Sequence, residues 1–226
     1  MKFLPKARLD AFADGVFAIV ITLLVLELTV PEGSANIISG LLQEWPVFLA
    51  YLVSFAFIGS VWISHSSITC LMKKETPHSY HLTLLMLFFV SLLPFTTKLM
   101  ATHLGAPLTV PGLDPLAALE TLNAIMRSAI STSVIIYGLN LLAATLSLNA
   151  IMRSSINTPE ILVEDSAISE INSMLRKERF AVIIILCSLI LAIFLPLIAV
   201  SGYIIVSALF FITPTISIAK ATLRNR

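Results

Sequence analysis

Charged residues are scarce in this sequence. Only 12% of its 226 residues are Asp, Glu, Lys or Arg, whereas a soluble domain carries about 25%. Hydrophobic residues make up 58% of the chain, and several apolar runs are long enough to cross a bilayer. We therefore expect an all-α integral membrane protein. The net charge of +1 and the lack of a basic block give no reason to expect a nucleic-acid partner.

Cysteines and enzyme motifs are also few. Cys70 and Cys187 lie in or beside apolar segments, which favours buried structural thiols over a disulfide or a metal site. The sequence contains no nucleophile elbow, phosphate loop, zinc-ligand spacing or pair of carboxylates in an apolar setting. We expect neither enzymatic activity nor a bound cofactor.

Six apolar stretches fit transmembrane helices. The first is too long for a signal-peptide core, so we expect it to be retained. Pro46 falls in the first turn of the second span, and Pro94 is expected to kink the third. Ser201–Gly202 is expected to form a tight turn between the last two spans. The expected spans are 8–30, 43–71, 79–102, 116–150, 180–200 and 203–220, in a single domain covering residues 1–226.

Positive charge predicts the orientation of these spans. With six crossings, the two termini and the loops near residues 73–78 and 151–179 lie on one side of the membrane. All of the 14 Lys and Arg residues except Lys98 and Arg127 fall on that side. Because cytoplasmic segments are rich in Lys and Arg, both termini are expected in the cytoplasm.

The first span, Arg8–Val30, is unusual for a helix that faces lipid. It carries Asp14, Gly15, Thr22 and Glu27, and polar groups in a spanning helix cost free energy unless they face protein or water. We interpret this helix as central and lining a water path. An ordinary anchor helix with polar ends is the alternative.

Helical periodicity divides the first span into faces. One stripe contains Phe12, Gly15, Ile19, Thr22, Leu23, Leu26 and Val30. Asp10 and Asp14 fall away from this stripe and are expected to point to a neighbouring helix. Such an apolar stripe is often plain packing. Thr22 within it, and Glu27 just beyond it, favour a pore.

One histidine stands out from the other three. His65 lies three residues after Trp62 in the second span, so both side chains project from one helical face. It should lie at about the depth of Asp14, and an Asp14–His65 pair would neutralise two costly groups together. The alternative is that His65 only packs or caps locally.

Three short motifs point to a known family. Arg8 is followed by Phe-Ala-Asp-Gly at residues 12–15, WISH occupies residues 62–65, and LLPF occupies residues 92–95. Together they resemble the lysosomal potassium channel family, transmembrane protein 175, in its prokaryotic six-helix branch. Ala13 replaces a serine of the family motif, and Thr96 stands where a proline is common.

The resemblance implies a homotetramer in which the first helices surround a central pore. By motif position, it implies a pore lined by Ile19, Thr22, Leu23 and Leu26, with constrictions at Ile19 and Leu26 and a potassium ion near Thr22. It implies an interhelical network of Arg8, Phe12, Asp14, Trp62 and His65. Glu27 is expected to attract cations at the outer mouth. No TVGYG-like loop is present, so we expect no carbonyl selectivity filter.

The sequence thus predicts a potassium-preferring cation channel of the cell membrane. Its expected partners are potassium ions, further copies of itself and the lipid bilayer. The main alternative is an ion- or proton-coupled transporter that uses an Asp14/His65 relay, and another is a membrane scaffold without transport. Transporters often show matching half-repeats or broken helices, and neither is visible here.

Overall fold

The computed structural model describes residues 5–28, 37–104, 115–164 and 166–209, the side chains of 37, 39, 43 and 115–127 excepted. These residues form α-helices and one short 3-10 helix, η1, so the expected all-α class is confirmed. The helices are α1 (Lys6–Val25), α2 (Ile37–Gln43), α3 (Trp45–Cys70), α4 (Pro77–Ser91), α5 (Leu93–Leu104), α6 (Pro115–Ile156), η1 (Pro159–Ile161) and α7 (Ser166–Phe194), followed by a helix over Pro196–Leu209.

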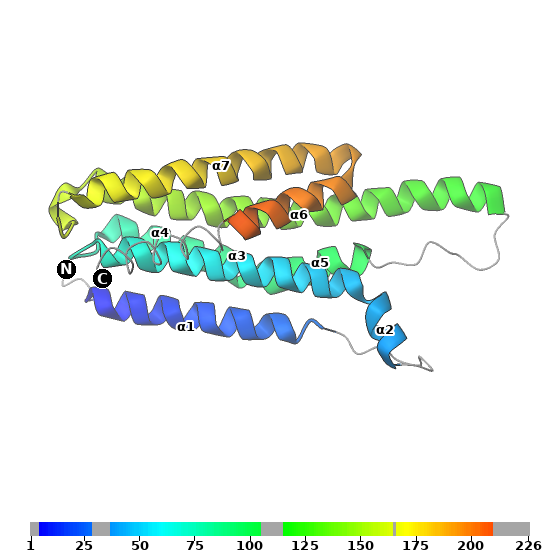
Figure 1. Cartoon of the computed structure of the whole chain (residues 1–226), viewed down its shortest axis with the longest axis horizontal. Coiled ribbons are helices and arrows are strands. Elements are labelled where there is room, and N and C mark those ends of the chain that lie inside the picture. Colours follow the sequence, from blue (N-terminus) through cyan, green and yellow to red (C-terminus); the bar gives the residue numbers. More distant parts are fainter. Residues whose placement is uncertain (1–4, 29–36, 105–114, 165, 210–226) are drawn as a thin grey trace, which may run out of the picture.

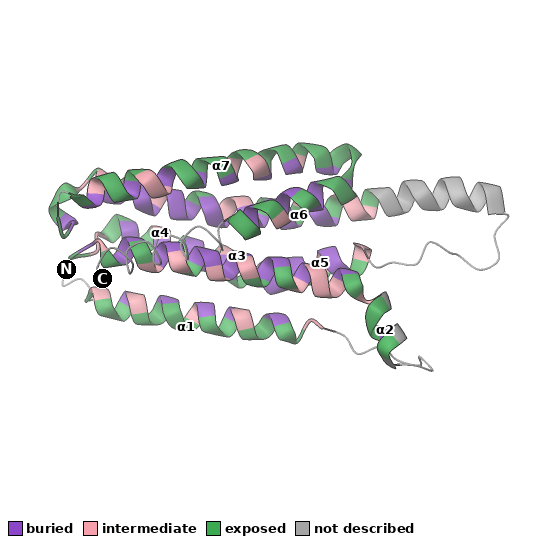
Figure 2. Cartoon of the chain, viewed as in Figure 1, coloured by how far each residue is buried: buried purple, intermediate pink, exposed green. Residues whose placement is uncertain are grey.

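The long helices lie side by side along one axis (Figure 1). α1 lies at one edge of the bundle, where it contacts α3, α4 and α5. α6 packs against α4, α5 and α7 and so joins the two halves of the bundle. This arrangement leaves one face of α1 without a neighbour in the single chain (Figure 2).

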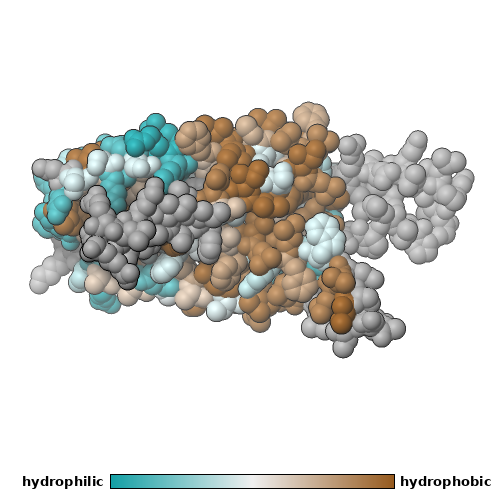
Figure 3. Space-filling model, viewed as in Figure 1, coloured by the Kyte–Doolittle hydropathy of each residue, from teal (hydrophilic) through white to brown (hydrophobic). Residues whose placement is uncertain are grey.

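The bundle has the dimensions and polarity of a membrane domain. Three stretches are long and apolar enough to cross a bilayer, namely Trp45–Cys70, Pro77–Leu104 and Ser128–Ile156. On the face that Figure 3 shows, hydrophobic residues gather over the middle of the bundle. Hydrophilic residues gather at the end that carries the start of α1 and the α3–α4 and α6–α7 connections. We call this the hydrophilic end.

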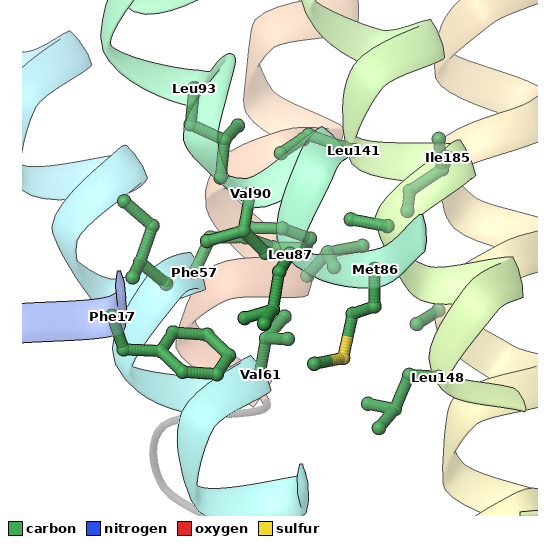
Figure 4. Close-up of a cluster of buried hydrophobic side chains, with 14 of the residues drawn as sticks. Phe17, Phe57, Val61, Met86, Leu87, Val90, Leu93, Leu141, Leu148 and Ile185 are labelled. Carbon is green, nitrogen blue, oxygen red and sulfur yellow. The ribbon is translucent and has the colours of Figure 1, made fainter. Parts of the chain in front are cut away.

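The core is formed by apolar side chains from α1, α3, α4, α5, α6 and α7 (Figure 4). Phe17 of α1 packs toward Phe57 and Val61 of α3, and Met86 and Leu148 meet deeper between α4 and α6. These side chains are almost completely buried. Because lipid tails are as apolar as Leu, such packing contributes mainly through close van der Waals contact.

A chain of hydroxyl groups crosses this core. Ser54 Oγ of α3 lies 2.7 Å from Thr97 Oγ1 of α5 and 2.9 Å from Tyr137 Oη of α6. Asn140 Nδ2 donates to Thr96 Oγ1 over 3.2 Å. These bonds join α3, α5 and α6 where water is excluded, as polar residues commonly do between membrane helices.

The kink expected at Pro94 is confirmed. The chain makes a turn at Leu92, between α4 and α5. Proline has no N–H to donate to the carbonyl of Val90 four residues earlier, so a regular helix cannot continue through this position. Pro46 lies in the first turn of α3, also as expected.

The turn expected at Ser201–Gly202 is wrong. Both residues lie within the helix Pro196–Leu209, and the break comes earlier, at Leu195. Pro196 interrupts the backbone hydrogen bonds of α7 and is well suited to start a new helix. Gly202 instead allows close packing, because a Cβ there would overlap Ser188 Oγ of α7.

The bounds of three other helices also differ from those of the expected spans. The span expected at 180–200 begins earlier, since α7 starts at Ser166, and ends at Phe194. The last expected span, 203–220, starts at Pro196, and its residues 210–220 lie outside the described part. α1 ends at Val25 rather than at residue 30.

The two cysteines, Cys70 and Cys187, are exposed rather than buried as expected, because apolar helix faces can meet lipid as well as protein.

The exposed face of the first helix and its contacts

The stripe predicted on α1 forms one exposed face of the chain. Ile19 is 60% and Leu26 75% exposed, and Phe12, Gly15, Thr22 and Leu23 are also exposed. The opposite face packs into the bundle through Leu9, Ala13, Phe17, Val20 and Leu24. Val30, the last residue of the stripe, lies outside the described residues. A helix that buries one apolar face and exposes another has room for a second set of protein contacts.

Thr22 places a hydroxyl group in the middle of this apolar face. Its Oγ1 donates to the carbonyl oxygen of Ile19 over 2.8 Å. The hydroxyl proton is therefore used within the helix, while the oxygen keeps lone pairs that can accept a hydrogen bond or face a cation.

Asp14 contacts α3, as its position off the stripe predicts, but its partner is not the expected one. Trp62 Nε1 donates to Asp14 Oδ1 over 2.8 Å. Among the described residues no hydrogen bond or ion pair joins Asp14 to His65, so the expected Asp14–His65 pair stays a prediction. His65 is buried, its Nε2 has no hydrogen-bond partner among these residues, and its ring lies 6.2 Å from that of Phe17. Trp62 lies one helical turn before His65, and its indole ring is long enough to reach the Asp14 carboxylate.

The remaining members of the expected network lie elsewhere. Arg8 and Phe12 are exposed, with Phe12 on the same face as Ile19. The structure therefore brings together Asp14 and Trp62 of the five residues, and the roles of the others stay predictions.

Glu27 follows the end of α1 and is paired. Its Oε2 lies 2.8 Å from Nζ of Lys98 on α5. The sequence placed both residues toward the outer side without connecting them, because they are far apart in the chain. The negative charge expected at the outer mouth is therefore largely compensated by a neighbouring positive charge.

The opposite end of α1 lies near the α3–α4 connection. Lys6 Nζ forms an ion pair with Asp10 Oδ2 at 2.7 Å. Burial raises the pKa of the nearby Glu75 carboxyl and Asp10 raises it further, while a hydrogen bond from Ser79 and the charge of Lys6 act against this. Ser79 also forms a capping box with Thr76 at the start of α4.

One buried acid was missed by the sequence analysis, which assigned it to a charged loop. Glu178 lies inside α7 and is almost fully buried. The signal was its spacing, because it continues a buried helical stripe that includes Ile171, Leu175, Ala181 and Ile185. Within the described residues no group of three His, Cys, Asp or Glu side chains is arranged to hold a metal ion.

Comparison with known proteins agrees with the motifs of the first three spans. The family model described as endosomal/lysosomal potassium channel TMEM175 matches residues 8–94. The resemblance to the TMEM175 family is thereby confirmed. The matched segment contains α3, α4 and all but the first two residues of α1, and with them both partners of the Asp14–Trp62 contact.

Individual TMEM175 relatives come from bacteria and animals. A potassium channel of Chamaesiphon minutus is 42% identical over 104 residues, which cover 44% of this chain and 51% of that protein. The human endosomal/lysosomal proton channel TMEM175 is 40% identical over 101 residues, covering 40% of this chain and 20% of that protein. The chain thus spans about half the length of the bacterial relatives that it matches.

The likeness in structure extends further than the likeness in sequence. The crystal structure of a lysosomal potassium-selective channel TMEM175 homologue from Chamaesiphon minutus has a TM-score of 0.72 at 26% identity, covering 91% of this chain and 95% of that one. A second solved potassium channel, MtTMEM175, has a TM-score of 0.59 at 18% identity and shows the fold alone.

Proposed function

We propose that this chain forms a potassium-preferring cation channel in the cell membrane. Four copies surround a central axis, and the exposed face of α1 lines the pore. Each copy crosses the membrane six times, with both termini in the cytoplasm. The observation that carries the proposal is the exposed apolar face of α1, with Thr22 at its centre, on the helix that bears the family motif.

The side chains on this face suit a pore that is gated by dewetting. Four-fold symmetry brings one Ile19 and one Leu26 per chain to the axis, and rings of apolar side chains resist wetting without any charged plug. Thr22 lies between the two rings. Its oxygen would face a partly dehydrated potassium ion, in a pore without a carbonyl filter.

The alternative, a proton-coupled transporter with an Asp14/His65 relay, has weaker support. A relay needs a hydrogen-bonded path between the two groups, and Trp62 holds the Asp14 carboxylate instead. Proton permeation nevertheless belongs in any test, because the animal relatives are named proton channels and the bacterial relatives potassium channels.

Cysteine accessibility tests the pore lining directly. Cys70 and Cys187 are first replaced by serine, since both are exposed. Ile19→Cys and Leu26→Cys are then made singly in this background, with Ile190→Cys as a control that is equally exposed but lies on α7. After reconstitution in liposomes, potassium and proton fluxes are measured before and after a permeant thiol reagent or Ag⁺ is added.

We expect block at positions 19 and 26 and none at position 190. A conducting protein that is not blocked at either α1 position would show that another surface lines the pore. Proton flux without potassium flux would reject the ion preference while leaving the pore assignment intact.

Stoichiometry provides a separate test. A single copy of α1 cannot enclose a pore, so native mass spectrometry in lipid should show a closed homo-oligomer of four chains. A monomer in both mild detergent and lipid would reject the central pore.

The Asp14–Trp62 contact should stabilise the position of α1 against α3. Trp62→Phe keeps the aromatic ring and removes the N–H donor, and we expect it to lower the free energy of unfolding by about 1 kcal/mol. Asp14→Ala should remove the same interaction, so the double variant should lose less than the sum of the two single losses. Denaturant unfolding in detergent measures all three variants.

The other tryptophan of α3 supplies the control. Trp45 is exposed, and Trp45→Phe should leave the free energy of unfolding nearly unchanged. Additive losses in Asp14→Ala and Trp62→Phe would show that the contact contributes no coupling energy.

A further inference from the structure

A cavity of about 340 Å³ lies between α6 and α7, away from the proposed pore. The two helices pack along their lengths (Figure 1). Among the described residues, those that line the cavity come from these two helices. Its volume is at the lower end of the range for small-molecule sites, about 300–1,000 Å³.

Two arginines supply the charge of this cavity. Arg153 comes from the last turn of α6 and Arg179 from α7, and both line the cavity with exposed side chains. Among the described residues, ion pairs join Lys6 to Asp10 and Lys98 to Glu27, so neither arginine has a carboxylate partner there. Paired guanidinium groups without a protein anion are suited to bind a phosphate, because each offers several N–H donors in a planar fork.

A buried amide adds an unused acceptor. Asn149 lies one turn before Arg153, lines the same cavity and is only 6% exposed. Its Nδ2 donates to the carbonyl oxygen of Thr145 over 3.1 Å, while its Oδ1 has no hydrogen-bond partner among the described residues. A buried carbonyl oxygen without a donor costs free energy, and a ligand with a hydroxyl group would satisfy it.

The two walls of the cavity become apolar in the same direction. On α6 the order from the hydrophilic end is Arg153, Asn149 and Leu146, and on α7 it is Arg179 followed by Val182 and Ile183. At 1.5 Å per residue, each wall changes from charged to apolar within about 10 Å. Leu146 and Ile183 are themselves exposed, so the apolar end of the cavity continues onto the apolar surface of α6 and α7.

We propose that this cavity binds the headgroup of an anionic glycerophospholipid. Arg153 and Arg179 hold the phosphate, and Asn149 Oδ1 accepts a hydrogen bond from a headgroup hydroxyl. The acyl chains leave along Leu146 and Ile183. Charge at one end of the cavity and apolar surface at the other match the phosphate and the acyl chains of such a lipid, whereas a free phosphate would use the arginines alone. Basic pockets between transmembrane helices bind anionic headgroups in this way.

Native mass spectrometry of the full chain tests the proposal. The protein is purified in a neutral detergent, offered equal amounts of phosphatidylglycerol and phosphatidylcholine, and the retained lipids are counted. The test variant is Arg153→Gln/Arg179→Gln. The control, Arg176→Gln/Lys177→Gln, removes the same number of charges from exposed neighbouring positions that do not line the cavity.

We expect the unmodified chain to retain phosphatidylglycerol about tenfold over phosphatidylcholine, because the choline cation of phosphatidylcholine is repelled by the two arginines and its headgroup has no hydroxyl for Asn149. The test variant should lose this preference, and the control should keep it within about twofold. Inorganic phosphate at millimolar concentration should not displace the lipid. Equal retention of both lipids by the unmodified chain, or equal loss in the two double variants, would overturn the proposal, as would displacement by phosphate.

Asn149→Leu gives a second measurement that leaves the charge unchanged. It should reduce retention of phosphatidylglycerol relative to phosphatidic acid, whose headgroup has no glycerol hydroxyls. Unchanged relative retention would remove Asn149 from the site. A thermal melt of each variant checks that the bundle remains folded.

Discussion

Ile19→Ala and Leu26→Ala are each expected to raise potassium flux about 3- to 10-fold in reconstituted liposomes, which corresponds to a barrier lowered by about 0.6–1.4 kcal/mol. Both side chains are among the most exposed on α1. In a symmetric pore each forms an apolar ring, and truncation to alanine widens that ring and makes it easier to wet. Potassium flux into liposomes, normalised to the amount of reconstituted protein, measures the effect.

Two further variants show whether the effect is local. Ile190→Ala truncates an equally exposed side chain on α7 and should leave potassium flux unchanged. Thr22→Val keeps the shape of the side chain but removes its oxygen, so it should mainly lower the ratio of potassium to sodium flux. Equal flux increases in Ile19→Ala and Ile190→Ala would point to general loosening of the bundle rather than to a pore on α1.

The second large effect concerns the ion pair at the far end of α1, where two neutralising substitutions should act in opposite directions. Lys98→Gln removes the positive partner, leaves the Glu27 carboxylate uncompensated and should raise cation conductance about twofold at low salt. Glu27→Gln leaves the ammonium group of Lys98 beside the pore entrance and should lower conductance by a similar factor. Single-channel recordings at two ionic strengths measure both.

High salt provides the control for this pair. At 1 M salt the Debye length is about 3 Å, so the conductances of the two variants should converge on that of the unmodified chain. The Lys98→Gln/Glu27→Gln double variant should resemble the unmodified chain at both salt concentrations. If both single variants lowered the conductance at every salt concentration, the pair would stabilise the fold rather than set the electrostatic potential at the pore entrance.

The sequence predicted the features that follow from local pattern. Hydropathy showed a membrane protein, and the kink at Pro94 followed from the missing N–H of proline. The stripe from Phe12 to Leu26 followed from the 3.6-residue period, and the structure places it on one exposed face of α1. These features depend on neighbours within a few residues, so a single sequence contains the necessary information.

Features that depend on distant neighbours were not predictable in the same way. Glu27 and Lys98 are 71 positions apart in the chain, and no local pattern indicates that α1 and α5 bring them together. Trp62 and His65 share a helical face, so spacing alone could not decide which of them reaches Asp14. Burial of Glu178 was missed because its charged neighbours suggested a solvated loop, although its helical spacing placed it with Leu175 and Ala181.

The two polar contacts of α1 also limit how this helix can move. Asp14 forms a hydrogen bond with α3, and Glu27, in the turn that follows α1, forms an ion pair with α5. The helix between them, from Asp14 to Val25, is about 17 Å long. A helix held near its middle and just beyond its end cannot tilt or slide unless one of these two polar contacts breaks. Rotation of an individual side chain such as that of Ile19 does not require either contact to break. Gating motions of α1 should therefore divide into fast rotamer changes within a fixed frame and rarer swings of the helix that first break a polar contact.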